Sequence, residues 1–556
     1  MDIDPQAVEV TKLSLLLKVL EGENAETLGR QLKLFHERAL PDLGNNIKCG
    51  NSLIGNDYYD RHQMDLFNED EMIRINAFDW DSEFSETMDP GGFDCIISNP
   101  PYIRIQTMKT WASTEVEFYK QYYVAAGKGN YDIYVVFVER AMQLLNQQGR
   151  MGYILPHKFF QAKYGAPLRE LISGGKHLGE IVHFGDQQVF EKASTYTCLL
   201  FLNKTENKNF RFVKAHNLHA WRINGEAIKG KIQADRVTKL EWNFIVGVGA
   251  SIFERLSEMP VNLGNVAPKI YQGSITSADT VFLFKEYQNE NESIVDVWSK
   301  ELNCEVKIER DILKPVVRSG KIGRYSANPT ALVLFPYKIK KCAAQLYTTA
   351  EMREQYPLAW AYLNQNKRLL ENREGGKFKD QQWYRFGRSQ NLGMWEQPKL
   401  MIPYMIKDLA AYYDQNDSFY FINVTTGGYG IIADETMISY PYLCGLLNSR
   451  LLDFYLKQVS TSFRGGYLAA NKQFIEQLPI RTINFDDPDE ITRHDKMISL
   501  VERMLDLNKR LVSSTAEHNR TLLKRQIAAT DRQIDQMVYE LYGLTDDEIL
   551  IVEQMT

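Results

Sequence analysis

The sequence predicts an α/β fold for its first part, an irregular α+β region for its middle and a helical hairpin at its end. From residue 1 to 204, short apolar strands alternate with helical stretches, as they do in a doubly wound parallel sheet. From 205 to 485 the chain is rich in aromatic residues and Gly-centred turns. From 486 to 556 the apolar residues recur with helical spacing. These three observations predict three domains with the same boundaries.

The elements of the first domain follow the order that an alternating α/β sheet requires. Helices are expected over 5–20, 131–146 and 164–173. The stretch 56–90 is polar and acidic and has no regular period, so we interpret it as an insertion. The expected strands are Ile47–Cys49, Phe93–Ser98, Met151–Leu155, Ile181–Phe184 and Thr197–Leu202.

The last domain carries two apolar helix faces separated by a polar segment. This pattern predicts two antiparallel helices joined by a short turn. The first face comprises Met497, Val501, Met504 and Leu511, and the second comprises Leu523, Ile527, Ile534 and Val538.

The composition excludes several classes of protein. The hydrophobic fraction of 44% and the charged fraction of 24% are typical of a globular protein in water. No apolar run reaches membrane-spanning length and no signal peptide opens the chain, so we expect a cytoplasmic protein without a membrane partner. The six cysteines are far apart in sequence and form no Cys-x-x-Cys pair, which argues against a disulfide framework and against a metal site.

The charge pattern leaves two interpretations open. A net charge of −6 gives no support for a nucleic-acid partner. Four basic residues nevertheless fall within eleven positions that contain no acid: Lys314, Arg318, Lys321 and Arg324. Such a cluster is either a solvated surface or a set of contacts to phosphates.

One segment carries a specific chemical signal. The apolar strand Phe93–Ser98 runs directly into Asn99-Pro100-Pro101-Tyr102. Two prolines cannot continue a sheet, so the chain turns sharply at the carboxyl end of the strand, where open α/β sheets bind ligands. The turn offers an amide oxygen, backbone carbonyls and an aromatic ring. An exocyclic amine needs two acceptors for its hydrogens, and a purine needs a stacking surface. The alternative is a rigid turn without chemistry.

The segment Asn99–Tyr102 resembles the N-P-P-Y motif of the amino-methyltransferases that act on adenine in DNA. The resemblance implies a Rossmann-like sheet, S-adenosyl-L-methionine as the methyl donor, and an adenine flipped out of double-stranded DNA. It further implies that Asn99 and Pro100 accept the two hydrogens of the adenine amine. Pro101 would stiffen the turn, and Tyr102 would stack on the extruded base.

Flanking segments resemble further motifs of the same family. Asp2 and Ile3 match the positions that bind the ribose and the adenine of the donor, although D-x-D-P is also a common helix start. Asn51 matches a polar position near the adenine of the donor, where Asp is more usual, and Asn99 also borders the donor. Phe190 matches an aromatic position that stacks on the extruded base.

The resemblance continues beyond the catalytic region. The middle of the chain is similar to the target-recognition domains of single-chain restriction–modification enzymes, through Tyr271–Thr276, Lys314–Arg318, Phe335–Tyr337 and Phe463–Tyr467. We therefore expect a site-specific adenine methyltransferase of a restriction–modification or phage-defence system. The expected DNA contacts are Arg318, Lys321, Arg324 and Arg464.

Two alternatives remain at this point. The pattern Asp296…Glu305-Val306-Lys307 loosely fits metal-dependent nucleases. In addition, family members carry a strand and a Gly-rich turn before the D-x-D-P segment, whereas this sequence starts there. We therefore expect a sheet that lacks its first strand, a chain that is inactive alone, and a separate N-terminal segment or nuclease domain as its partner. The alternative function is a catalytically inactive DNA-binding or specificity fragment.

Overall fold

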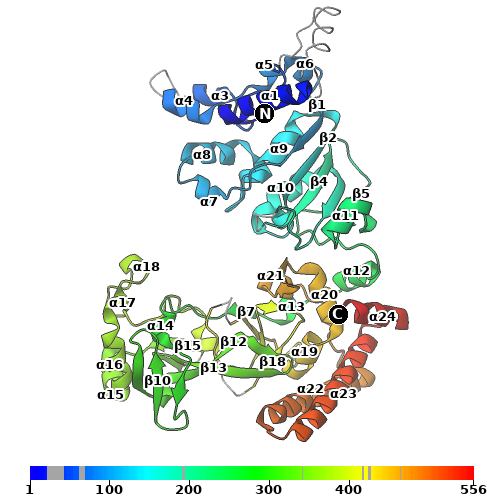
Figure 1. Ribbon diagram of the computed structural model, residues 1–556. Helices are drawn as coiled ribbons and strands as arrows, with labels where there is room; N and C mark the ends of the chain where they lie inside the picture. The colour runs from blue at the N-terminus through cyan, green and yellow to red at the C-terminus, as the bar shows by residue number, and fades with distance from the viewer. Residues whose placement is uncertain are drawn as a thin grey trace, which may run out of the picture. The chain divides into compact units, whose positions relative to one another are not determined.

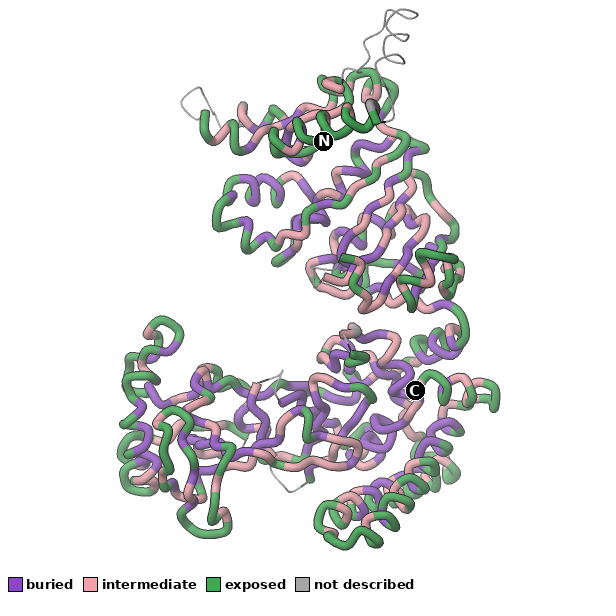
Figure 2. The backbone as a smooth tube through the Cα atoms, viewed as in Figure 1, coloured by how far each residue is buried: buried purple, intermediate pink, exposed green. Residues whose placement is uncertain are grey.

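The computed structural model describes residues 1–556 except 22–42, 62–68, 191–194, 341, 416–418, 424–426 and 464. The chain divides into two compact units, Met1–Gly247 and Val248–Thr556 (Figure 1). Each unit has its own buried core, which Figure 2 shows in purple.

The first unit is built on a six-stranded mixed sheet in the order β1-β2-β4-β3-β5-β6. β1 and β2 are parallel, as are β3 and β5, whereas β4 is antiparallel to both β2 and β3, and β6 is antiparallel to β5. This confirms the predicted α/β class. The strands are β1 (Phe93–Ser98), β2 (Leu145–Pro156), β3 (Leu178–His183), β4 (Thr197–Asn203), β5 (Asn209–Lys214) and β6 (Ile228–Gln233).

Four of the five predicted strands are present, and one is not. Ile47–Cys49 forms no strand: Cys49 makes only an isolated bridge to Asp2. The sheet also continues past residue 204, because β5 pairs with β3 and β6 pairs with β5. The first unit accordingly ends at Gly247, further along the chain than the expected boundary.

The helices of the first unit include all three that the sequence predicts. They are α1 (Pro5–Leu20), α9 (Tyr134–Leu144) and α10 (Ala166–Gly174). α9 is buried on most of its circumference and packs on β2, which explains its nearly continuous apolar sequence. The remaining helices are α3 (Asp57–Arg61), α4 (Glu69–Ile75), α5 (Trp80–Glu83), α6 (Ser85–Met88), α7 (Ile105–Met108), α8 (Ser113–Tyr122) and α11 (Leu218–Asn224).

β1 lies at the edge of the sheet and pairs only with β2 among the described strands. Its outer side is open, and the Ile97 side chain is 83% exposed. The expectation that a further strand belongs beside β1 stays a prediction.

The second unit combines small antiparallel sheets with helices. The longest hairpin is formed by β12 (Leu313–Gly323) and β13 (Ser326–Leu334), with β8 (Leu283–Phe284) beside β13. A four-stranded sheet has the order β18-β16-β19-β7, from β18 (Tyr412–Asp414), β16 (Lys399–Ile402), β19 (Tyr429–Ile432) and β7 (Lys269–Gln272). Shorter pairings join β9 (Tyr287–Gln288), β10 (Ile294–Ser299) and β11 (Cys304–Glu309); β14 (Tyr337–Lys340) and β15 (Ala343–Leu346); and β17 (Met405–Ile406), β20 (Ser462–Phe463) and β21 (Tyr467–Ala469).

The predicted helical hairpin is confirmed as α22 (Pro488–Ser513) and α23 (Glu517–Leu541), which pack against each other. Pro488 occupies the first turn of α22, and Asp487 caps it by accepting from the backbone N–H of Asp489. The remaining helices are α12 (Ala250–Ser257), α13 (Leu263–Val266), α14 (Asp279–Phe282), α15 (Thr349–Gln355), α16 (Pro357–Gln365), α17 (Lys367–Glu371), α18 (Arg373–Gly376), α19 (Tyr440–Leu447), α20 (Arg450–Val459), α21 (Lys472–Ile475) and α24 (Asp546–Met555).

Candidate active site

The Asn99–Tyr102 turn leaves the sheet at the carboxyl end of β1, as the sequence predicts. A short antiparallel contact anchors the chain beyond it. The backbone N–H of Ile105 donates to the carbonyl of Tyr131 at 2.9 Å, and that of Ile133 donates to the carbonyl of Ile103 at 2.9 Å. Because β1 holds one end of the turn and this contact holds the other, the turn has little freedom to move.

Within the turn, the Tyr102 hydroxyl fixes the Asn99 side chain. It lies 2.8 Å from Asn99 Oδ1 and 3.0 Å from the carbonyl oxygen of Ile154 on β2. Burial, with a smaller effect of the nearby Cys198, raises the pKa of Tyr102 to about 12, so the hydroxyl keeps its hydrogen at neutral pH. The sequence assigned a role only to the ring. The hydrogen bond between the Tyr102 hydroxyl and Asn99 is not predicted by the sequence.

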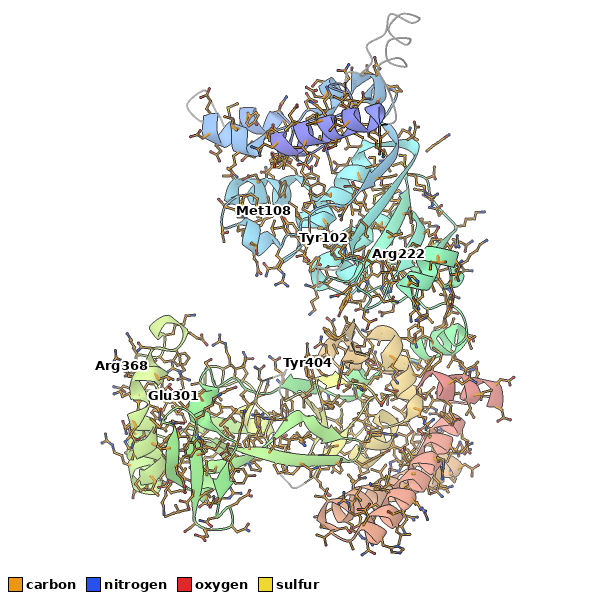
Figure 3. The ribbon with its side chains drawn as sticks, in the orientation of Figure 1. Tyr102, Met108, Arg222, Glu301, Arg368 and Tyr404 are labelled. Carbon is orange, nitrogen blue, oxygen red and sulfur yellow. The ribbon has the colours of Figure 1, made fainter. Side chains whose placement is uncertain are left out.

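A buried polar network supports the Tyr102 ring, which Figure 3 labels in the first unit. The Tyr134 ring meets it edge-on, with centroids 6.4 Å apart. The Tyr134 hydroxyl lies 2.9 Å from that of Tyr164, which donates to Asp132 Oδ2 at 3.1 Å. Burial raises the pKa of Tyr134 well above its usual range, so this hydroxyl also stays protonated. The network holds the aromatic ring in one orientation.

Phe190 lies in the loop after β3, and its residue is 36% exposed. Gln187 ties this loop to the segment after β5: its amide Nε2 donates to the carbonyl of Ala215 at 3.1 Å, and its Oε1 accepts from the N–H of Leu218. Phe190 makes no ring contact with a described aromatic residue. The stacking role stays a prediction.

The residues matched to the donor occupy two adjoining segments. The N–H of Gly50 donates to the carbonyl of Asp2 at 2.9 Å, which places the segment of Asp2 and Ile3 beside that of Asn51. The helix-start interpretation also applies, but to the next acid: Asp4 caps α1 by accepting from the N–H of Gln6 at 2.8 Å.

The side chains of these residues differ in availability. Asp2 and Ile3 are exposed, and Ile3 is 49% exposed. Asn51 is only 8% exposed, and its Oδ1 accepts from the N–H of Leu53 at 3.0 Å. The Asn51 side-chain oxygen is therefore engaged in a hydrogen bond within the turn that contains it.

A pocket of 280 Å³ lies along β1 and is also lined by α9 and by Tyr153 of β2. Its lining includes Met1, Ser52 and Ser98, which are the sequence neighbours of Asp2, Asn51 and Asn99. None of these three predicted site residues lines the pocket itself.

The four expected DNA contacts in the second unit have different surroundings. Arg318 and Lys321 lie on β12 and have no ion pair with a described acid. Arg324 is instead held by the Asp531 carboxylate, with both guanidinium nitrogens 2.8 Å from its oxygens, and by the carbonyl of Asn448. It joins the β12–β13 hairpin to α23, so we no longer propose it as a DNA contact. Arg464 lies outside the described residues.

The residues of the nuclease-like pattern have a structural explanation. Asp296 and Lys307 are directly opposite each other in the β10–β11 pair, and their charged groups are 3.7 Å apart. Across the described ranges, no group of three His, Cys, Asp or Glu side chains could hold a metal ion. Nor does the described part of the chain contain a helix with the length and apolarity needed to cross a membrane.

Comparisons with known proteins extend over the whole chain. Residues 1–190 match the Eco57I restriction-modification methylase family, and residues 347–480 match the TaqI-like C-terminal specificity domain. The type II restriction enzyme and methyltransferase RM.Eco57I of Escherichia coli is 30% identical over 576 residues, which cover 100% of this chain and 55% of that protein. The chain thus spans about half the length of this relative.

One further relative and one solved structure are also similar to this chain. The type II methyltransferase M.BstVI of Geobacillus stearothermophilus is 23% identical, with 87% of this chain and 78% of that protein covered. Among solved structures, the type IIL restriction-modification enzyme MmeI in complex with DNA has the same fold, with a TM-score of 0.54 and 13% identity, over 86% of this chain and 59% of that one. The chain contains an Eco57I-like restriction–modification methylase domain followed by a TaqI-like C-terminal specificity domain.

Proposed function

We propose that the protein transfers a methyl group from S-adenosyl-L-methionine to the N6 amine of an adenine at a specific site in double-stranded DNA. The observation that carries the proposal is the anchored Asn99–Tyr102 turn at the carboxyl end of β1, in which the Tyr102 hydroxyl lies 2.8 Å from Asn99 Oδ1. The adenine is flipped out of the duplex to reach this turn. The family assignment supports methyl transfer to DNA in general.

The chemistry follows from the acceptors in the turn. The adenine amine is a poor nucleophile because its lone pair is delocalised into the ring. Hydrogen bonds from its two hydrogens to Asn99 Oδ1 and to the Pro100 carbonyl draw the nitrogen toward tetrahedral geometry and localise that pair. When bound, S-adenosyl-L-methionine supplies a methyl group already activated by a sulfonium charge. The residues therefore act by positioning the amine and by stabilising the charge that grows on its nitrogen.

The Tyr102 hydroxyl takes part in this arrangement without touching the reacting atoms. Before the adenine enters, the hydroxyl donates to Asn99 Oδ1 or to the Ile154 carbonyl, which both lie within hydrogen-bond distance. Asn99 Oδ1 has two lone pairs, so it can accept from the Tyr102 hydroxyl and from the adenine amine at the same time. The hydroxyl can therefore hold Asn99 in its working orientation in both states.

Labelled methyl donor tests the proposal. The natural polypeptide that contains residues 1–556 is incubated with the donor and with duplex DNA, RNA and a carrier protein in separate reactions. We expect label in duplex DNA alone. Label in RNA or protein, with none in DNA, would refute the proposal. DNA binding without any transfer would favour the alternative of a DNA-binding specificity module.

Replacement of Tyr102 separates the roles of ring and hydroxyl. Tyr102→Ala removes a stacking surface worth about 1–3 kcal/mol, so kcat/KM is expected to fall by about ten- to a hundredfold. Tyr102→Phe keeps the ring and loses the contact with Asn99, worth about 0.5–1.5 kcal/mol, so a fall of about two- to tenfold is expected. Steady-state kinetics measure both. An unchanged kcat/KM in Tyr102→Phe would show that the hydroxyl does not position Asn99.

The basic residues of the second unit provide a second prediction. Arg318→Ala and Lys321→Ala are each expected to weaken DNA binding and to reduce the slope of log affinity against log salt by about one. Arg324→Ala breaks the ion pair with Asp531, so it is expected to lower the unfolding temperature instead. Anisotropy titrations and thermal unfolding distinguish the two outcomes. Wild-type salt slopes in both Arg318→Ala and Lys321→Ala would remove β12 from the DNA interface.

A further inference from the structure

Four basic side chains gather at the carboxyl ends of three strands in the first unit. His157 directly follows β2, His183 ends β3, Lys214 ends β5, and His216 lies two residues beyond. These strands run in the same direction as β1, because β2 is parallel to β1, β4 is antiparallel to both β2 and β3, and β5 is parallel to β3. The basic edge cluster (His157, His183, Lys214 and His216) therefore lies at the carboxyl end of the strands, which is also the end at which the Asn99–Tyr102 turn leaves β1.

The members of the cluster are packed against one another. The His157 and His183 rings stack with centroids 4.2 Å apart and an angle of 6° between their planes. His183 and Lys214 are direct partners in the parallel pairing of β3 with β5. Phe160 and Phe212 lie on the inner side of His183, with ring centroids 6.1 Å and 6.0 Å away. Aromatic rings thus occupy the interior side of His183. His157, His183 and Lys214 are half-buried.

The polar atoms of the cluster are poorly satisfied. His157 Nδ1 is buried and has no hydrogen-bond partner among the described residues. His183 Nδ1 accepts from the N–H of Gly185 at 3.1 Å, so the neutral ring carries its hydrogen on Nε2 and can donate from there. Lys214 forms no ion pair within the described ranges, and burial lowers its pKa.

Two other buried cations of this protein have acceptors for their charged groups. Lys399 is paired with Asp414, and the Arg169 guanidinium donates to the carbonyls of Phe159, Ala162 and Lys239. Among the described residues, Lys214 has neither kind of partner. The pKa of His183 lies well below its usual value, mainly because the ring is buried and then because its neighbours His157, Lys214 and His216 are basic. Desolvated donors and cations without acceptors are costly, and an anion would offset that cost.

The position of the cluster identifies which anion fits. Cys198 on β4 pairs with Leu155 on one side and with His183 on the other. Leu155 directly follows Ile154, whose carbonyl accepts from the Tyr102 hydroxyl. The cluster therefore begins within a few residues of the catalytic turn. The segments of Asp2 and Asn51 lie beside β1, whereas Lys214 ends β5, which is four places along the strand order.

We propose that the basic edge cluster binds a backbone phosphate of the DNA strand from which the adenine is flipped. Lys214 supplies the charge, and the His183 Nε2–H supplies a hydrogen bond. This inference rests on the proposed function, because it takes the extruded nucleotide at Asn99 as its neighbour. A phosphate held here would fix the strand on one side of the flipped base, where stacking and pairing with the duplex have been lost.

The salt dependence of DNA binding tests the site. Lys214→Met removes the charge while keeping an unbranched side chain of similar length, and it relieves an unpaired buried charge, so the fold should be preserved and thermal unfolding verifies this. Lys208→Met is the matched control, since Lys208 is exposed and lies just before the amino end of β5, whereas Lys214 lies at its carboxyl end. Binding to a fluorescent duplex is measured over a range of KCl concentrations.

We expect Lys214→Met to bind about tenfold more weakly at low salt and to lose about one unit of salt slope, as one phosphate contact requires. Lys208→Met and Lys214→Arg should keep the wild-type slope. An unchanged slope in Lys214→Met would overturn the proposal. The two proposals can fail separately. If the wild type methylates adenine but the Lys214→Met slope is unchanged, only the phosphate site is refuted. If the slope depends on Lys214 but no adenine is methylated, only the proposed reaction is refuted.

Neutral methylphosphonates locate the phosphate. Replacing one phosphate next to the target adenine should weaken wild-type binding and should cost little further in Lys214→Met, because both changes remove the same contact. Fully additive losses at every phosphate tested would contradict the assignment to DNA. So would competition by inorganic phosphate in the absence of any dependence on a single DNA phosphate.

Discussion

Asn99→Ala is expected to lower the rate of methyl transfer by about 100- to 1,000-fold while leaving the affinity for DNA within about twofold of wild type. Asn99 Oδ1 is one of two acceptors for the adenine amine in the proposed mechanism, and the interaction strengthens as charge develops on the nitrogen. The side chain is exposed and its one described partner is the Tyr102 hydroxyl, so its loss should not disturb the fold. Single-turnover kinetics with saturating DNA measure the effect.

Asn146→Ala is the matched control for this variant. Asn146 lies near the amino end of β2, whereas Asn99 follows the carboxyl end of the adjacent parallel strand β1. The Asn146 amide donates to Asp94 Oδ1. The control should keep wild-type transfer. A rate for Asn99→Ala within threefold of the control would contradict the proposed role of the amide.

Lys399→Met is expected to destabilise the second unit by about 3–5 kcal/mol, because it leaves a buried carboxylate without its cation. Lys399 and Asp414 side chains are 0% and 1% exposed and lie 2.5 Å apart. The Lys399 ammonium also donates to the carbonyl of Trp395 at 2.7 Å, and Asp414 accepts from the N–H of Phe419 at 2.9 Å. Denaturant unfolding followed by tryptophan fluorescence measures the loss, and Trp395 is one of the eight tryptophans of the chain.

The double variant Lys399→Met/Asp414→Leu should recover most of the lost stability, since replacing both ions leaves no unpaired buried charge. Lys496→Met, at an exposed position of α22, should change stability by less than about 0.5 kcal/mol. A loss in Lys399→Met no larger than in this control, or a double variant less stable than the single one, would contradict the argument.

The sequence predicted the Asn99–Tyr102 turn well because its signals are local. Strand Phe93–Ser98, the prolines that end it and the flanking helices follow from apolar runs and from proline geometry, and the structure confirms these elements. Ile47–Cys49 was predicted as a strand and forms only a bridge. A run of three residues, of which Lys48 is charged, is too short to distinguish a strand from a segment that makes a single backbone contact.

Interactions between distant residues were not predictable. The basic run at 314–324 gave four residues in one pattern, yet Arg324 is paired with Asp531 more than two hundred positions away. The Tyr102 hydroxyl contact depends on the Ile154 carbonyl of a neighbouring strand. The basic edge cluster draws single residues from the ends of β2, β3 and β5, which share no sequence motif. Only the order of the strands brings such groups together.

The position of the transferred methyl group tests the central claim most directly. DNA is incubated with the natural polypeptide that contains residues 1–556 and with a donor carrying an isotopic methyl label, and it is then digested to nucleosides for mass spectrometry. The account predicts that labelled N6-methyladenine is formed, and that it disappears in Asn99→Ala while the Asn146→Ala control retains it. Labelled methylcytosine in the absence of labelled N6-methyladenine, or undiminished N6-methyladenine in Asn99→Ala, would contradict the account.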